Sequence, residues 1–247
     1  TASSSTAITV TPDSTTSLEP FVHNMTVSTL AKAHTLSFPS YSTANAVFDS
    51  SGHADTVIFG IGSYSGDTFS RDTNIALQSI SITNSTTIQD VASQINSLSG
   101  TGLSASVVKT GDASFSLVVK SQLGASKKIH MSTQDTNNSN GLGANNEIAA
   151  ISYTTPSNST HAAKQVVAGT DSAFTFDGIS ITRPTNLITD LVPGVSLELN
   201  ATSSTNVEVG AAYDETQALD ILTAFVTEVN TLRTTMTNMT DMGSDGG

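Results

Sequence analysis

The sequence contains no cysteine and no tryptophan, and only nine of its 247 residues are lysine or arginine. Without cysteine, neither disulfide bonds nor thiol chemistry contribute to this protein. The formal net charge is −12, and the few basic residues are scattered along the chain. Nucleic acids and anionic membrane surfaces are both bound by several basic side chains on one face. We therefore expect neither as a partner.

Long apolar runs are also missing. None approaches the roughly 18–20 residues that a helix needs to cross a bilayer, so we expect no membrane insertion. No charged-then-apolar segment marks a secretory signal at the start, which predicts that export, if it occurs, uses no cleavable signal peptide. The chain begins with Thr1 rather than Met, which suggests a processed product or a fragment.

The polar residues that are present are mostly serine, threonine and asparagine. Threonine favours strands because its side chain is branched at Cβ, whereas serine and asparagine favour turns. A chain of this length can form one large or two ordinary domains, each with its own core. The acidic, threonine-rich composition is typical of an extracellular bacterial surface protein.

The stretch from Asp171 to Leu199 is the most informative part of the chain. Phe174 and Phe176 alternate with polar residues before the dipeptide Asp177-Gly178, and alternating apolar residues follow it. Asp-Gly favours a type I′ turn, which needs positive φ at both central positions. This pattern predicts a β-hairpin.

The same stretch continues with a predicted helical segment and a third strand. The apolar residues of 187–192 have the 3–4 spacing of one or two helical turns. Pro193-Gly194 ends this segment. Val195, Leu197 and Leu199 then alternate as a strand.

A short helix is predicted over residues 86–99. Thr86 and Gln89 fit a capping box, with Thr86 as N-cap, and Gly100 and Gly102 suit the C-terminal stop. The apolar residues fall on one helical face: Ile88, Val91, Ala92, Ile95 and Leu98.

Alternating apolar residues predict further strands elsewhere in the chain. A longer strand is predicted over residues 21–38, with a bulge at 29–31 where the alternation breaks. Polar loops are predicted at 39–55 and 132–148. The shorter strands are predicted near residues 8–10, 57–61, 75–82, 103–107, 115–119 and 207–209.

A long amphipathic helix is predicted at the C-terminal end, with Asp214 as a plausible N-cap. Its apolar residues recur with strict 4–3 spacing, which is typical of helix pairing through a and d positions. We call these residues the seam: Ala218, Leu222, Phe225, Val229, Leu232, Met236 and Met239. No other segment has a matching seam, so we expect the partner helix to lie outside this chain or in another copy. The alternative is a core helix packed on a β domain.

The sequence offers no site for catalysis. Residues 135–141 resemble a calcium loop, but Asn140 and Asn146 stand where glycine and an acid are required. No serine lies in a Gly-x-Ser-x-Gly turn, and Gly60-Ile61-Gly62 precedes no helix. The five histidines share no metal-ligand spacing: His23, His34, His53, His130 and His161. We therefore expect no catalytic residue, metal or cofactor, and no enzyme activity.

Three segments resemble the flagellar filament cap proteins, the hook-associated protein 2 (FliD) family. They are TVSTLAKAHTL at 26–36, QINSLSGTGLSASVV at 94–108 and the DGI…TR…N.I.D…PGVSLEL order at 177–199. The second segment resembles the "IN" motif that hook-associated proteins share with flagellins.

The resemblance implies a mainly β fold with some α, in which one β domain is inserted into another. Residues 20–38 and 160–212 would form the discontinuous domain, and 39–159 the inserted one. Residues 1–19 and 213–247 would belong to a helical leg domain, most of which lies outside this fragment.

The resemblance also implies a function at the distal tip of the flagellar filament, outside the cell. Several copies would form a ring-like cap that promotes insertion of exported flagellin. Two alternatives stay open. One is an extracellular adhesin that binds host surfaces or mucin, which the lack of tryptophan disfavours. The other is a hook–filament junction protein or a flagellin-like filament component.

Overall fold

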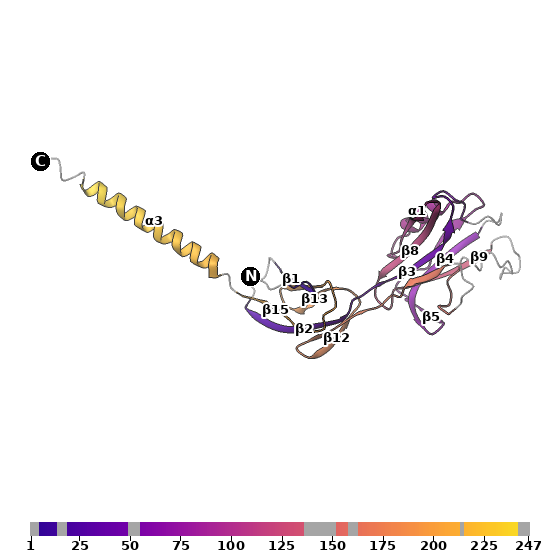
Figure 1. The fold of residues 1–247 in the computed structure, drawn as a ribbon, viewed down its shortest axis with the longest axis horizontal. Coiled ribbons are helices and arrows are strands. Elements are labelled where there is room, and N and C mark those ends of the chain that lie inside the picture. The colour runs from indigo at the N-terminus through magenta and orange to yellow at the C-terminus, as the bar shows by residue number, and fades with distance from the viewer. Residues whose placement is uncertain are drawn as a thin grey trace.

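The computed structural model describes residues 5–13, 19–48, 55–135, 152–157, 163–212 and 215–241. Three bodies follow one another along a line: a C-terminal helix, a smaller β unit beside the N-terminus, and a larger β unit at the far end (Figure 1). We call the two β bodies the inner unit and the outer unit. The prediction of a mainly β fold with some α is confirmed.

The inner unit is a sandwich of two sheets with strand orders β1-β14-β13 and β12-β11-β2-β15. Its core includes Met25, Val27, Phe174, Ile188 and Leu197. Every strand pair is antiparallel. The strands are β1 (Ile8–Pro12), β2 (Phe21–Thr29), β11 (Ser172–Phe176), β12 (Ile179–Arg183), β13 (Leu187–Val192), β14 (Val195–Leu199) and β15 (Val207–Ala211).

The predicted hairpin is confirmed. β11 and β12 pair antiparallel on either side of Asp177-Gly178. Both turn residues have positive φ, 47° at Asp177 and 83° at Gly178, as a type I′ turn requires. The third predicted strand is also present as β14, on the other sheet.

The predicted helical turns at 187–192 are wrong, because this segment is strand β13. Ile188 and Val192 are both buried. Residues four apart lie on the same face of a strand as well as near one another on a helix, so the spacing fits both. A register shift between Ile188 and Val192 blurs the alternation, and Leu187 is 54% exposed.

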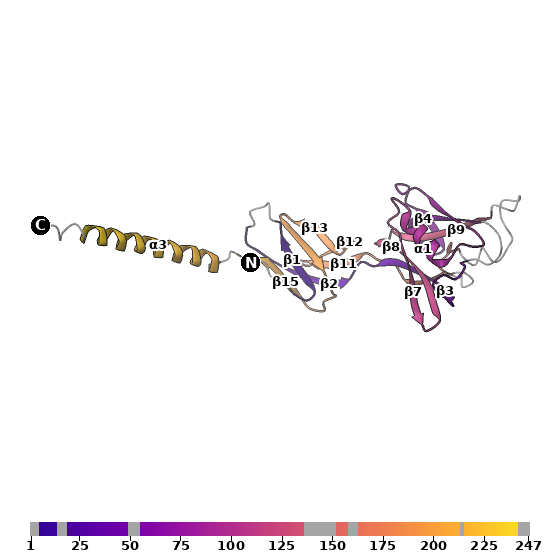
Figure 2. The same cartoon turned by 90° about the horizontal axis from the view of Figure 1, so that it is seen from above.

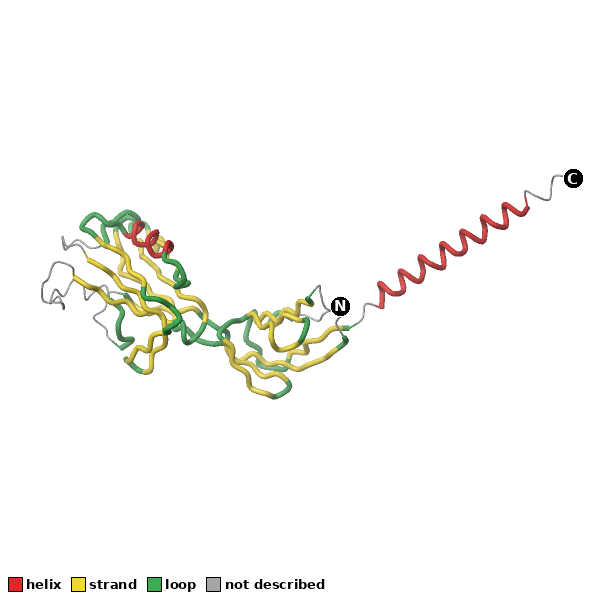
Figure 3. The backbone as a smooth tube through the Cα atoms, turned by 180° about the vertical axis from the view of Figure 1, so that it is seen from behind, coloured by secondary structure: helices red, strands yellow, loops and turns green. Residues whose placement is uncertain are grey.

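The outer unit contains two further sheets and the short helix. The backbone tube in Figure 3 shows this helix in red at the upper edge of the outer unit. The sheet orders are β10-β3-β8-β7 and β5-β4-β6, with β9 paired to the other edge of β4. The elements are β3 (Ala33–Tyr41), β4 (Asp55–Ser65), β5 (Thr68–Arg71), β6 (Gln78–Ile82), α1 (Ile88–Ser97), β7 (Ser104–Gly111), β8 (Ser114–Leu123), β9 (Lys128–Asp135) and β10 (Lys164–Val167).

Helix α1 buries the predicted face, Ile88, Val91, Ala92 and Ile95, in the outer core. Its capping box lies one residue later than predicted. Thr87 is the N-cap, and the Asp90 carboxylate accepts hydrogen bonds from the Thr87 backbone and hydroxyl. Asp performs here the role predicted for Gln89, because a carboxylate also reaches back to the N-cap. Thr86 is buried instead, and its hydroxyl accepts the Thr83 backbone N–H.

The predicted bulge at 29–31 is the passage from one unit to the other. β2 ends at Thr29 in the inner unit, and β3 begins at Ala33 in the outer unit. Leu36 and Phe38 therefore pack in the outer core and not with Met25.

The same reasoning shifts the other expected boundaries. β10 pairs with β3 of the outer unit, and β1 pairs with β14 in the inner unit rather than belonging to a leg. We propose boundaries near residues 30–32 and 168–170, in place of 38–39 and 159–160, and an inner unit that includes β1.

Some strands lie in polar segments and were not predicted from the sequence. β5 follows the Ser65–Thr68 turn in a stretch where no strand was predicted, and β9 extends to Asp135, into the predicted 132–148 loop. Residues 49–54 and 136–148 of the two predicted loops lie outside the described residues.

Candidate functional site

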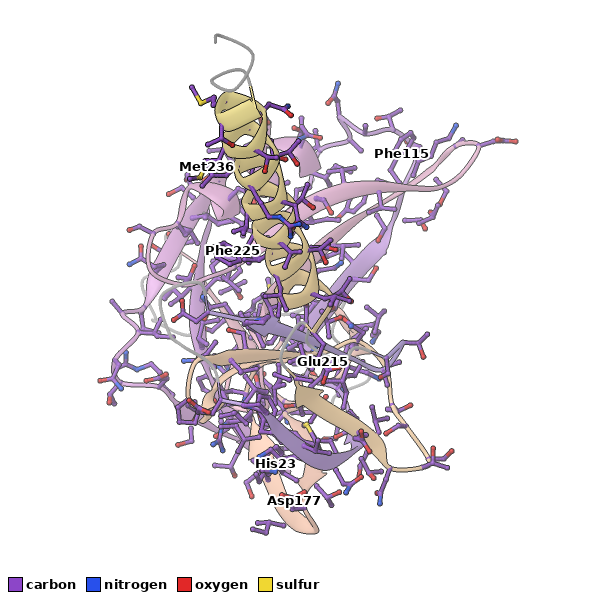
Figure 4. All side chains as sticks on the ribbon, turned by 90° about the vertical axis from the view of Figure 1, so that its left-hand side faces the viewer. His23, Phe115, Asp177, Glu215, Phe225 and Met236 are labelled. Atoms are coloured by element: carbon purple, nitrogen blue, oxygen red, sulfur yellow. The ribbon has the colours of Figure 1, made fainter. Side chains whose placement is uncertain are left out.

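The structure describes three of the five histidines, His23, His34 and His130. The ring of His23 lies 2.7 Å from the Asp177 carboxylate, which also accepts the Asn24 backbone N–H; both residues are labelled in Figure 4. Two hydrogen bonds hold the pKa of Asp177 below its usual range: the larger effect comes from the Asn24 N–H and the smaller one from the His23 ring. His53 and His161 lie outside the described residues.

His34 and His130 serve the outer unit. His34 is fully buried, where Nε2 contacts Gln165 Oε1 and Nδ1 accepts the Ile129 N–H. The ring of His130 stacks on Phe69 at 4.4 Å. Each of the three described histidines thus has a structural environment of its own.

Within the described ranges, no group of three or more His, Asp or Glu side chains is arranged to hold a metal ion. The calcium-like segment lies outside these ranges beyond Asp135. A helix long and apolar enough to cross a bilayer is not found in the described part of the chain either.

The candidate functional site is the apolar face of α3 (Glu215–Asp241). This helix projects away from both β units (Figures 1 and 2), and it has no extensive packing contact with any described helix or strand. The predicted N-cap Asp214 lies outside the described residues. The predicted alternative, a core helix packed on a β domain, does not fit this arrangement.

Every seam residue is exposed. Phe225 is 64% exposed and Met236 60%, and both project from the same side of the helix in Figure 4. The other members are Ala218, Leu222, Val229, Leu232 and Met239. Isolated apolar side chains on a surface are ordinary, but a contiguous exposed apolar face marks an interaction site.

The seam is wider in the first half of the helix than in the second. Leu219, Ile221 and Val226 are also exposed and flank it there. From Val229 onwards the face narrows to a shallow groove of about 470 Å³, lined by Val229, Leu232, Arg233, Met236, Thr237 and Thr240.

Outside the seam, α3 is rich in threonine, which has low helix propensity. Seven threonine hydroxyls donate to the carbonyl four residues earlier, at 2.7–3.0 Å: those of Thr223, Thr227, Thr231, Thr234, Thr235, Thr237 and Thr240. The threonine hydroxyls are thereby satisfied within the helix. A helix of this composition depends on burial of its apolar face for stability.

Sequence reasoning missed the roles of two asparagines in the recognised motifs. Asn96 of the "IN" segment binds the backbone of Ala105 on β7. Asn186, from the stretch before β13, binds the backbone of Ala31 in the other recognised segment. The motifs identified these residues, but local patterns do not show which distant backbone a side-chain amide reaches.

The region that carries the seam is similar in sequence to known proteins. Residues 169–245 match the model of the flagellar hook-associated protein 2 C-terminus. Over these residues the chain is similar to the FliD family. The match begins just before β11 and extends through α3, so it includes the hairpin and every seam residue.

Relatives named flagellar hook-associated protein 2 share sequence with the chain. The Helicobacter pylori protein (strain ATCC 700392 / 26695) is 37% identical over 83 residues, which are 33% of this chain and 12% of that protein. The Treponema pallidum protein is 39% identical over 62 residues, 25% of this chain and 9% of that protein. The aligned parts are therefore small portions of these FliD relatives.

Solved FliD structures share the fold over most of the chain. The D1-D2-D3 domains of the Escherichia coli flagellar cap protein FliD match with a TM-score of 0.67 at 19% identity, covering 94% of this chain and 64% of that structure. FliD from Pseudomonas aeruginosa PAO1 matches with a TM-score of 0.63 at 22% identity, covering 93% and 94%. The likeness to FliD thus extends in fold well beyond residues 169–245.

Proposed function

We propose that this chain is part of a structural protein that caps the distal end of the bacterial flagellar filament. The observation that carries the proposal is the exposed seam on α3, inside the part that matches FliD. The chain would act outside the cell, at the filament tip, and would promote insertion of exported flagellin. We propose that it is not an enzyme.

The seam would be buried by helix pairing in the full-length protein. Strict a and d spacing over three heptads is the pattern of paired helices. The partner would be a helix from the opposite end of the full-length chain, as the family resemblance implies, and together they would form the leg domain. The wide apolar face around Leu219 and Val226 suits packing against more than one helix.

Self-association would follow from this arrangement. Rigid β units would form the plate of a ring of several copies, and the legs would contact the filament. Flagellin would be the partner beneath the ring.

Immunogold electron microscopy of the source cells, with antibodies raised against this chain, tests the location. We expect label only at filament tips. Label along whole filaments indicates a flagellin-like component, and label over the cell body indicates an adhesin; either result contradicts the proposal.

Seam substitutions in the full-length protein test the assembly. Phe225→Asp with Leu232→Asp places two carboxylates in the seam, and we expect loss of ring-sized species in analytical ultracentrifugation. The matched control is Thr227→Asp with Thr234→Asp, on the threonine-rich side of the same helix, which should leave assembly unchanged. Equal assembly in both variants would contradict a role for the seam.

A further inference from the structure

In the part of the chain that the structure describes, two passages join the inner and outer units. One runs through Leu30–Lys32 between β2 and β3, and the other runs through 168–171 between β10 and β11. We call these two passages the neck. Figure 3 shows the narrowing of the backbone between the two units.

The described residues of the two units do not share an apolar core. Their buried residues form two separate clusters, and no extensive contact joins a described strand of one unit to a described strand of the other. Open grooves of about 660 Å³ and 540 Å³ adjoin the neck. No shared apolar core therefore sets the angle between the described parts of the two units, so the contacts at and beside the neck must do so.

The two passages pair with each other. The Lys32 N–H donates to the Thr170 carbonyl at 2.9 Å, and the Thr170 N–H donates to the Lys32 carbonyl at 3.1 Å. This single antiparallel bridge ties the passages side by side, but one bridge leaves rotation about its axis open.

Asn186 of the inner unit holds the first passage. Its side-chain Oδ1 accepts the Ala31 N–H at 2.7 Å, and its Nδ2 donates to the Ala31 carbonyl at 3.1 Å. Ala31 is only 4% exposed. Both polar groups of a buried peptide segment are thus satisfied by one side chain, and leaving either without a partner is costly.

Asp171 holds a turn of the outer unit against the second passage. Its Oδ1 accepts the Ala125 N–H at 2.6 Å. The Gly124 N–H donates to the Lys32 carbonyl at 3.3 Å. A side chain at Gly124, where φ is +116°, would approach Pro184 of the inner unit at 3.2 Å. The turn after β8 therefore lies against both the neck and the inner unit.

We propose that Asn186 and Asp171 are positioning residues that hold the inner and outer units at one fixed angle. Asn186 fixes the direction in which the chain leaves the inner unit, and Asp171 fixes the outer unit to the returning passage. The two contacts act on different passages, so together they oppose the rotation that the Lys32–Thr170 bridge leaves open.

Distances between spin labels on the two units test this proposal. The chain has no cysteine, so spin labels attach only at cysteines that are introduced. Ser180→Cys on β12 and Lys109→Cys on β7 place one label on each unit, both at exposed positions. Double electron–electron resonance of this parent should give one narrow distance distribution. In the variant with Asn186→Ala and Asp171→Ala, the distribution should become at least about twice as wide.

Two controls make the test specific. Asn206→Ala removes an asparagine that accepts the Thr26 hydroxyl inside the inner unit, and it should leave the distribution unchanged. Asp171→Asn keeps Oδ1 as an acceptor for Ala125 and should restore the parent width relative to Asp171→Ala. If the double variant fails to fold, Asp171→Ala alone gives the test, since it leaves both cores intact. A parent distribution that is already broad, or an unchanged width in the Ala variants, would overturn the proposal.

Discussion

The side chain of Asn96 pairs with both backbone groups of Ala105. Oδ1 accepts the Ala105 N–H at 2.7 Å, and Nδ2 donates to its carbonyl at 2.8 Å. β7 is an edge strand of its sheet, and the Asn96 side chain makes the hydrogen bonds to it that a neighbouring strand would make. The same contact ties α1 to β7. Exposed strand edges invite pairing with other chains, so this contact also covers part of a vulnerable edge.

Replacing Asn96 should weaken the outer unit. Asn96→Ala removes two exposed hydrogen bonds, and we expect the free energy of unfolding to fall by about 1–2 kcal/mol. Urea unfolding followed by circular dichroism measures this. Asn238→Ala, on the exposed surface of α3, is the control and should change little; an equal loss in both variants would disprove the role of the Ala105 contact.

The buried ring of His34 should make the outer unit sensitive to acid. Burial lowers the pKa of His34 to about 4; the Gln165 hydrogen bond opposes this, and Lys128 adds to it. The unfolded chain therefore binds a proton at higher pH than the folded one, near pH 6.5. Stability should fall as the pH drops from about 6.5 to 4, by up to about 3 kcal/mol from this residue.

His34→Asn provides the comparison, because asparagine offers an acceptor to Ile129 but does not titrate. We expect this variant to be less stable than the wild type at pH 7 and to lose less stability on going to pH 4. Urea unfolding at both pH values measures the difference. Parallel pH profiles for the two proteins would refute the prediction.

Gly62 should not tolerate a side chain. A Cβ there would overlap the Ser70 carbonyl oxygen and approach the Arg71 Cα at 2.9 Å, so β4 and β5 would have to separate. We expect Gly62→Ala to destabilise the protein by roughly 2–4 kcal/mol. Gly66→Ala, at a turn with φ +58° and open space, should cost about 1 kcal/mol. Thermal unfolding ranks the two, and the reverse order would refute the prediction.

Seam substitutions should leave the β units unaffected. Because α3 has no extensive packing contact with them, Leu232→Asp should leave the thermal transition of the 247-residue chain within about 1 °C of the parent. Leu197→Asp is the contrast, since it places a charge in the inner core and should abolish folding. A large shift for Leu232→Asp would show that α3 packs on a β unit in solution.

Local chemistry made several elements predictable. The Asp177-Gly178 turn needs positive φ at both residues, and few dipeptides meet that need. The buried face of α1 followed from its period, since Ile88 to Ile95 fits only one helical face. The exposed seam of α3 was predicted in the same way, while helix pairing through it stays a prediction.

The errors arose where two structures share one local pattern. The spacing of Ile188 and Val192 suits a strand and a helix equally. The extended run through Leu30 and Ala31 has the same sequence pattern whether the chain bulges within one sheet or passes into another unit. Such choices depend on distant partners, here the neck contacts of Asn186 and Asp171, which no local window contains.

The pairing of β1 with β14 bears on the order in which the two units are expected to fold. The outer unit uses β3 to β10, an unbroken stretch of chain, so its strand pairs need no residue from either end of the chain. Strand β1 pairs with residues 195–199, so this pair closes a loop that contains the whole outer unit. Closing so long a loop is slow, and strand β1 is exposed to wrong pairing in the meantime. The outermost part of the molecule is thus positioned to fold first, and the part beside the helix to close last.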